Sequence, residues 1–213
     1  MYDHARGSEA RHKNGYYCGE GSLCGRFPAS AVLLPDGAVM NITLEEIKKQ
    51  EEYSRLSRIW EHPVYQEQFQ KLQEAEQTRE FCKHTLEHFL DVARIAWILN
   101  LEQGYGLSRE LLYGAALMHD LGRYGELLEG TPHDEASAAL CEQLLPSCGF
   151  SQQEVHTIVN AVLHHRSHKE QEAFDPFSAC LRLADKLSRN CFACPSSSSC
   201  NWTEEKRNLK IYL

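Results

Sequence analysis

The sequence lacks both long hydrophobic runs and an apolar leader. None of its 213 residues lies in a window that approaches the roughly 20 consecutive apolar residues needed to cross a bilayer. Residues 1–15 are polar and charged, without the apolar centre of a signal peptide. These absences predict a cytoplasmic protein with no membrane partner.

Positive charge is also scarce. The chain has 22 Lys and Arg against 30 Asp and Glu, which gives a formal net charge of −8. A protein that binds nucleic acid polymers or anionic membranes through charge needs the opposite balance. We expect neither partner, whereas a small phosphorylated substrate held by a few local cations fits the composition.

The sequence shows no repeat of 20–50 residues, and its length and 42% hydrophobic content predict one globular domain with a short extension. Residues 1–40 lack periodicity, which predicts an irregular N-terminal extension with a small hairpin over 32–40. Helical periodicity dominates afterwards, so we predict an all-α fold. Capping residues and Pro and Gly stops place helices at 43–60, 65–78, 79–101, 108–122, 133–146, 151–165 and 175–190.

Two acidic residues fall in apolar helical contexts. Asp120 follows His119 at the end of the apolar run 115–118, and Asp185 also has apolar neighbours. A carboxylate in such a place is costly unless it is paired or binds a metal. The His-Asp pair alone equally fits a solvated helix end, but His88 lies in the middle of an apolar helix. His84 is one turn earlier, which predicts that both imidazoles share one helical face.

Further histidines follow downstream, and each group falls on or beside a separate predicted helix. Helical bundles bring nitrogen and oxygen ligands to dinuclear metal sites in this way. Imidazole and carboxylate ligands favour Fe, Mn, Co, Ni or Zn over Ca. The candidate metal ligands are His88, His119, Asp120, His133, His164, His165 and Asp185, with His84 as a further candidate.

Three segments resemble the signature of the HD-domain metal-dependent phosphohydrolases: His88 with Val92-Ala93, His119-Asp120-Leu121-Gly122, and Ala184-Asp185-Lys186. The resemblance covers about residues 80–190. It implies an HD-domain helical bundle over 41–190, followed by a cysteine-containing tail over 191–213. His133 and the His164-His165 pair resemble the dinuclear members, which include bacterial diadenosine tetraphosphate hydrolases and HD-GYP phosphodiesterases. The GYP motif is absent, which argues against cyclic-di-GMP as the substrate.

The resemblance implies hydrolysis of a nucleotide or related phosphate mono- or diester by a metal-activated water, with two divalent ions. It assigns the core ligands His88, His119, Asp120 and Asp185 and the further ligand His133. His165 aligns best with the next ligand position and His164 competes with it, whereas His84 matches no core position.

Other residues near the motifs suggest supporting roles. A carboxylate can offer one oxygen to each of two ions, so Asp120 suits a bridging ligand. Arg123 and Lys186 are the leading candidates to hold a substrate phosphate, because each lies within three residues of a candidate ligand. Arg166, Lys169 and Arg189 are further candidates for that role, and Asp91 or Asp134 for orienting an imidazole.

Nine cysteines in a chain without a secretion signal favour reduced thiols or metal ligands over disulfides. Cys191, Cys194 and Cys200 form a C-x2-C-x5-C pattern, whose first pair can chelate one ion. Zinc or an iron–sulfur cluster would need a fourth ligand. The candidates for that ligand are Cys18, Cys24, Cys82 and Cys180, and the alternative is three reduced thiols in a loop.

Two other functions fit the same residues. Some diiron oxygenases resemble this sequence in scaffold and ligand set, and the ligands alone do not separate them from hydrolases. A non-enzymatic module that senses metal or redox state through the cysteine tail is the third hypothesis. We predict the phosphohydrolase first, with its substrate set by pocket shape rather than by the ligands.

Overall fold

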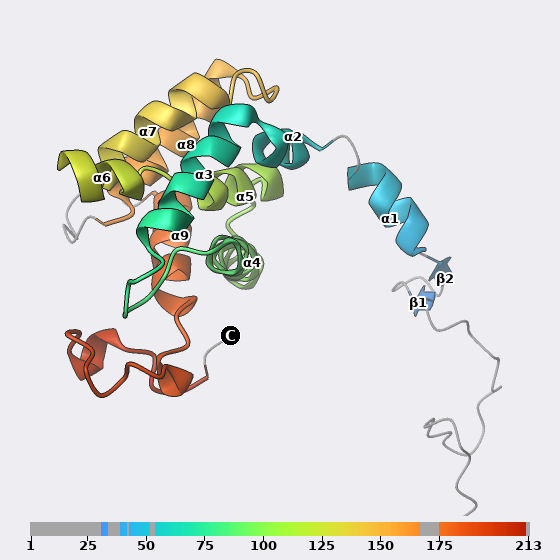
Figure 1. Ribbon diagram of the computed structural model, residues 1–213. Coiled ribbons are helices and arrows are strands. Elements are labelled where there is room, and N and C mark those ends of the chain that lie inside the picture. The colour runs from blue at the N-terminus through green and yellow to red at the C-terminus, as the bar shows by residue number, and fades with distance from the viewer. Residues whose placement is uncertain (1–30, 34–38, 42, 52–53, 167–174, 212–213) are drawn as a thin grey trace, which may run out of the picture. The chain divides into compact units, whose positions relative to one another are not determined.

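The computed structural model describes residues 31–33, 39–41, 43–51, 54–166 and 175–211 (Figure 1). The chain divides into two compact units, Met1–Lys49 and Gln50–Leu213. In the first unit, strands β1 (Ala31–Leu33) and β2 (Val39–Asn41) pair antiparallel, as the predicted hairpin requires, with its turn outside the described residues. Residues 1–30 of the predicted extension also lie outside them.

Helices build the rest of the described chain, so the fold is all-α as predicted. Helix α1 (Leu44–Glu51) begins with the expected capping box, in which Glu46 N–H donates to Thr43 Oγ1 at 3.1 Å and Thr43 N–H donates to Glu46 Oε2 at 2.9 Å. The following elements are α2 (Arg55–Glu61), α3 (Pro63–Ala75), α4 (Leu86–Gln103), α5 (Arg109–Met118), α6 (Arg123–Glu129), α7 (His133–Leu144), α8 (Gln152–His164), α9 (Pro176–Leu187) and the 3-10 turns η1 (Cys191–Ala193) and η2 (Glu204–Lys206).

Helix starts differ from the sequence prediction where a polar side chain caps a new helix. The predicted helix 43–60 is two helices, because Ser54 accepts a hydrogen bond from Ser57 N–H and begins α2. The predicted helix 79–101 begins late, because Thr85 caps α4 by accepting from His88 N–H. The prediction that His84 and His88 share a helical face was therefore wrong, since His84 precedes the helix.

Helix α6 was not predicted. It follows Gly122 directly and ends at Gly130, whose φ of +74° is a left-handed conformation that glycine adopts readily. The chain leaves the helix over residues 119–122 and becomes helical again immediately after Gly122, where we expected a stop. This extra helix matters because it carries residues that contact the site described below.

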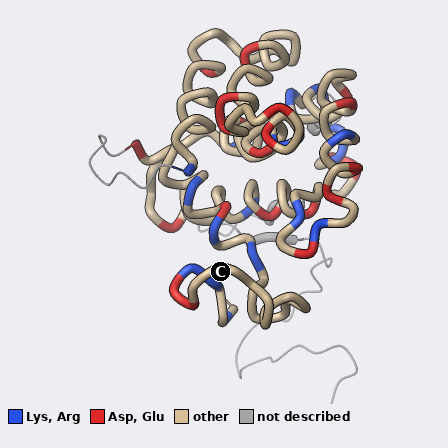
Figure 2. The backbone as a smooth tube through the Cα atoms, turned by 60° about the vertical axis from the view of Figure 1, so that its left-hand side comes forward, with Lys and Arg blue, Asp and Glu red and all other residues tan. Residues whose placement is uncertain are grey.

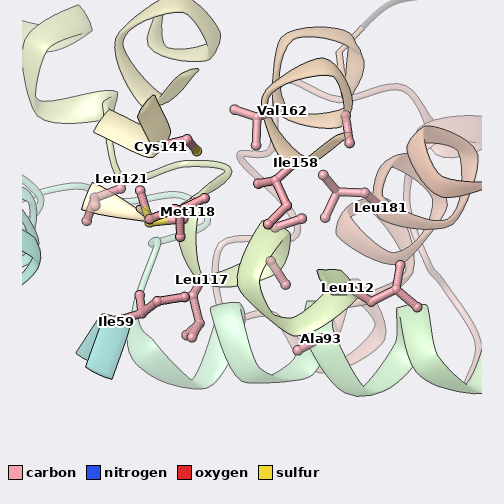
Figure 3. Close-up of a cluster of buried hydrophobic side chains, with 14 of the residues drawn as sticks. Ile59, Ala93, Leu112, Leu117, Met118, Leu121, Cys141, Ile158, Val162 and Leu181 are labelled. Carbon is pink, nitrogen blue, oxygen red and sulfur yellow. The ribbon is translucent and has the colours of Figure 1, made fainter. Parts of the chain in front are cut away.

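The core lies around α5, which packs against α2, α4, α7, α8 and α9 (Figures 1 and 3). Residues Leu112, Ala115, Ala116 and Met118 of α5 are fully buried. Burying one large aliphatic side chain contributes about 1.5–3 kcal/mol, so this central helix is firmly held. Helix α9 packs along α4 and also contacts α8. Every helix with a candidate ligand on it or at its end thus packs against another such helix.

No helix within the described residues is long and apolar enough to cross a membrane.

Candidate metal centre

Five helices deliver buried polar side chains to one place in the core. His88 lies on α4 and Asp185 on α9, while His133 is the first residue of α7. His119 and Asp120 directly follow α5, and His165 directly follows α8. His119, Asp120, His133, His165 and Asp185 are all buried, and the His88 side chain is about 10% exposed. Residues up to 97 positions apart in the chain (185 − 88 = 97) thus meet in the interior.

Asp120 is the centre of this cluster, because its two carboxylate oxygens face different histidines. Oδ2 lies 3.3 Å from His119 Nε2 and 4.0 Å from His88 Nε2. Oδ1 lies 3.1 Å from His133 Nε2 and 3.7 Å from His165 Nε2. One carboxylate therefore joins two separate sets of imidazoles.

Two groups of ligand atoms in the described residues have the spacing that a metal ion requires. Within each group, the ligand atoms lie within 4.8 Å of one another. The first group is His88, His119, Asp120 and Asp185, and the second is Asp120, His133 and His165. Because Asp120 belongs to both, the arrangement suits two ions that share a carboxylate.

The histidine rings are oriented to present a nitrogen lone pair to a cation. His119 Nδ1 donates to the carbonyl of Ala116 at 2.7 Å, and His165 Nδ1 donates to the carbonyl of Val162 at 2.5 Å. A donating Nδ1–H leaves Nε2 as the ligand atom. Nε2 of His88 and of His119 is buried without a hydrogen-bond partner among the described residues. Such orphaned nitrogens are costly in a core, and a bound cation would satisfy them.

Three side chains that the sequence did not single out orient these rings. Glu126 Oε2 lies 2.7 Å from His133 Nδ1, and Ser188 Oγ lies 3.2 Å from His88 Nδ1. Glu76, which is 2% exposed, accepts from the His84 ring at 2.7 Å. The sequence prediction offered Asp91 or Asp134 for this role. Asp91 instead pairs with Arg94 at 3.4 Å on the exposed side of α4.

Two of the predicted ligands, His84 and His164, belong to neither of these two groups, which we call the metal-spaced groups. His84 Nε2 reaches Asp120 Oδ2 at 3.3 Å but does not belong to either group. His164 Nδ1 bonds to the carbonyl of Asn160, and His165 rather than His164 enters the cluster. The structure thus places His84 beside the shared carboxylate, within ion-pair distance of it.

The charges of the cluster explain its unusual acid–base behaviour. Burial and the charge of His119 lower the pKa of His88 to about 3. For His119, burial favours the neutral form, but Asp120 and Asp185 outweigh it and raise the pKa to about 10. Burial opposes ionisation of Asp120 as well, yet His119 and His84 hold its pKa well below the usual value. Two buried carboxylates thus demand a positive charge, which a proton supplies here and a metal ion would replace.

A cavity of about 510 Å³ opens onto this cluster. Asp120, His133, His165 and Asp185 form one side of it. The rest of the wall is rich in basic side chains, namely Arg123, Arg166, Lys186, Arg189 and Lys206, and also includes Glu205 and neutral residues. Of the predicted phosphate-binding residues, only Lys169 lies outside the described residues.

Replacing Glu76 with Gln should weaken metal binding about 10-fold, because Glu76 holds His84 and His84 contacts the shared carboxylate of Asp120. Glu76 accepts from both the His84 ring and the His84 N–H, each at 2.7 Å, and an amide has only one oxygen for two donors. Metal affinity measured by calorimetric titration tests this. Glu142→Gln on the exposed side of α7 is the control, and wild-type affinity in Glu76→Gln would contradict the role of Glu76.

Comparison with known proteins agrees with this geometry. The family model described as HD domain matches residues 85–190. An uncharacterized protein from Clostridium beijerinckii is 42% identical over 137 residues, which cover 64% of this chain and 85% of that protein. Ribonuclease Y from Sulfurovum sp. is 24% identical over 168 residues, which cover 74% of this chain and only 31% of that protein.

A solved structure shares the fold. It is a predicted HD superfamily hydrolase from an uncultured Thermotogales bacterium, with a TM-score of 0.50 and 25% identity over 71% of this chain and 86% of that chain. The family match spans the whole candidate centre, from the cap of α4 to the residues after Asp185. The chain therefore belongs to the HD-domain family.

Proposed function

We propose that this protein hydrolyses a nucleotide or a related phosphate mono- or diester. The observation that carries the proposal is the carboxylate of Asp120, which joins two metal-spaced groups at the wall of a cation-lined cavity. Phosphoryl transfer needs positive charge on both sides of the reacting phosphorus, and little covalent chemistry from the protein. This site offers that combination.

Six residues would bind the two ions, and His84 would position the carboxylate that the ions share. His88, His119 and Asp185 would hold one ion, His133 and His165 the other, and Asp120 both. Divalent ions at such a site polarise phosphoryl oxygens and lower the pKa of a bound water toward neutrality. His84 fixes the shared carboxylate through its contact with Asp120 Oδ2.

The basic residues of the cavity would bind the substrate phosphate. Arg123 Nη1 lies 3.5 Å from Asp120 Oδ1, so its guanidinium borders the metal cluster. Arg189 is held against Asp185 at 3.0 Å on the other side. Guanidinium groups match phosphate oxygens bidentately, so these two side chains would fix a phosphoryl group between them.

We infer a small substrate rather than a nucleic acid polymer. The net charge is −8, and basic and acidic positions are interspersed along the backbone (Figure 2). A polymer would need cations well beyond one cavity. The relative named Ribonuclease Y makes RNA a necessary member of any substrate panel, although this chain spans 31% of that protein.

The experiment is a substrate screen on anaerobically purified protein of known metal content. The panel contains nucleoside mono-, di- and triphosphates, dinucleoside polyphosphates, phosphate monoesters and a short RNA. We expect metal-dependent release of phosphate or nucleotide from a small substrate. Inactivity of fully metallated protein on every phosphate ester would refute the proposal, and two irons with oxygen uptake on a diol would favour the diiron oxygenase.

Lys186→Met should raise KM about 10-fold with a smaller change in kcat, since a charged hydrogen bond contributes roughly 1.5–3 kcal/mol. Lys186 lines the cavity beside Asp185. Arg182→Met is the control, because Arg182 lies one turn earlier on α9 and is not among the cavity-lining residues. Steady-state kinetics on the best substrate of the screen would measure both variants. An equal rise in KM for both would assign the effect to general charge rather than to contact.

A further inference from the structure

Four cysteines from two distant parts of the chain line a second cavity. This cavity has a volume of about 370 Å³, and Cys82, Cys191, Cys194 and Cys200 all contribute to its wall. Cys82 precedes α4, whereas the other three lie in the tail after α9. The fold therefore selects Cys82 from the candidates for a fourth ligand. Cys180 is buried on α9 away from this cavity, and Cys18 and Cys24 lie outside the described residues.

Hydrogen bonds hold the two cysteine-bearing segments together. Ser196 Oγ donates to the carbonyl of Glu80 at 3.0 Å, and Ser199 Oγ donates to the Glu80 carboxylate at 2.7 Å. Arg79 Nε donates to the carbonyl of Cys82 at 2.9 Å. The turn between Cys194 and Cys200 is thus fixed against the segment that carries Cys82. This arrangement keeps the four cysteines at the wall of the same cavity.

The wall of this cavity carries both basic and acidic side chains, among them Arg189, Arg207, Glu87 and Asp91. Arg207 Nε is buried and has no hydrogen-bond partner among the described residues. A buried N–H without an acceptor at the wall of this cavity is costly, and an anionic occupant of the cavity would offset that cost. All four thiols are free in the structure.

We propose that Cys82, Cys191, Cys194 and Cys200 bind a second metal centre through four thiolates, separate from the His/Asp cluster. Four thiolates are the ligand set of structural zinc and of iron–sulfur clusters. In a zinc site with Zn–S bonds of about 2.3 Å, the sulfurs lie roughly 3.8 Å apart. The cysteine sulfurs are not among the described groups whose ligand atoms lie within 4.8 Å. A [4Fe–4S] cluster, in which each thiolate binds a separate iron, accepts a wider sulfur spacing than a single zinc ion does, so it is the first occupant to test.

The position of this centre gives it a structural role at the substrate cavity. The tail that it fixes supplies Trp202, Lys206 and Asn208 to the wall of that cavity. Arg189 lies over the Trp202 ring at 4.5 Å and contacts Asp185 at 3.0 Å. Asn208 Nδ2 donates to the carbonyl of Lys186 at 2.7 Å. A metal bound by the four cysteines would therefore fix the tail against Arg189, which contacts Asp185, and against Lys186, which we propose to bind the substrate phosphate.

The test measures metal and acid-labile sulfide per chain in anaerobically purified, full-length protein. Asp120→Asn removes the shared ligand of the other centre, and we expect it to keep the thiolate-bound metal. Cys200→Ala and Cys194→Ala should lose that metal, whereas Cys148→Ala, a cysteine buried elsewhere, should retain it. Circular dichroism of each variant checks that it is folded.

The outcomes are distinct. Iron with matching sulfide and broad visible absorption would establish the cluster, and one zinc per chain lost with the cysteines would establish the site with a different occupant. Asp120→Asn protein that holds no metal, or a disulfide among these cysteines in anaerobic protein, would overturn the proposal. Neither result depends on phosphatase activity, so the proposed function fails or stands separately.

Discussion

Asp120→Asn should deplete both halves of the His/Asp centre and lower turnover by about 10²–10³-fold or more, the range seen when one key electrostatic group is removed. The carboxylate faces His119 and His88 through Oδ2 and His133 and His165 through Oδ1. An amide keeps only one oxygen and turns an NH₂ group toward the other set of histidines. Metal per chain after dialysis and phosphate release with the best substrate measure the two effects.

Asp91→Asn is the matched control for that variant. Asp91 also lies near a predicted ligand on α4, but it pairs with Arg94 at the surface. It should keep wild-type metal content and activity. If Asp120→Asn still bound two ions tightly, the shared-carboxylate arrangement would be wrong, and the two metal-spaced groups would have to act independently.

Three of the candidate ligands stood out in the sequence because each one breaks an apolar pattern, whereas His133 and His165 came from the family resemblance. Asp120 and Asp185 are charged residues inside runs that otherwise belong to the core, and His88 lies among apolar neighbours of α4. Burial of such groups is costly, so their presence in an amphipathic or apolar helix signals a compensating partner. The all-α fold was predicted from a separate signal, the helical periodicity of the apolar residues.

The residues that orient the ligands could not be read in this way. Glu76 follows a helix that is polar in sequence, and only the return of the chain through residues 77–85 brings it against His84. Glu126 lies on α6, which was not predicted. The contacts of Glu76 and Glu126 depend on tertiary packing rather than on the local sequence pattern. The same is true of Cys82, which only the fold brings to the cysteines of the tail.

The choice between His164 and His165 depends on where a helix ends. The hydrophobic periodicity of a sequence locates the end of a helix only to within a few residues. The side chains of neighbouring residues in a helix point in different directions. In the structure α8 ends at His164, and His165 turns inward with its Nδ1 bonded to Val162. A one-residue shift of this end would exchange the two side chains, so the sequence alone left both open.

Gly122→Ala should destabilise the protein and weaken the His133 side of the centre. Gly122 follows Asp120 by two residues, and its N–H donates to Ser137 Oγ of α7 at 2.8 Å. An added Cβ would lie 2.4 Å from Ser137 N and 2.8 Å from Ala136 C, which are backbone atoms that cannot rotate away. We expect a loss of about 1–3 kcal/mol, the usual cost of overpacking, because α7 must move, and with it His133 at its first residue.

Gly125→Ala separates this close approach from the ordinary effect of adding a methyl group. Gly125 lies in α6, and its added Cβ would meet only Ala136 Cβ, at 3.9 Å. Alanine in a helix is favoured over glycine by roughly 0.5–1 kcal/mol, so this variant should be as stable as wild type or more so. Thermal unfolding and metal titration of both variants decide the matter. Equal stability of the two would show that α7 yields easily and that the contact at Gly122 does not position His133.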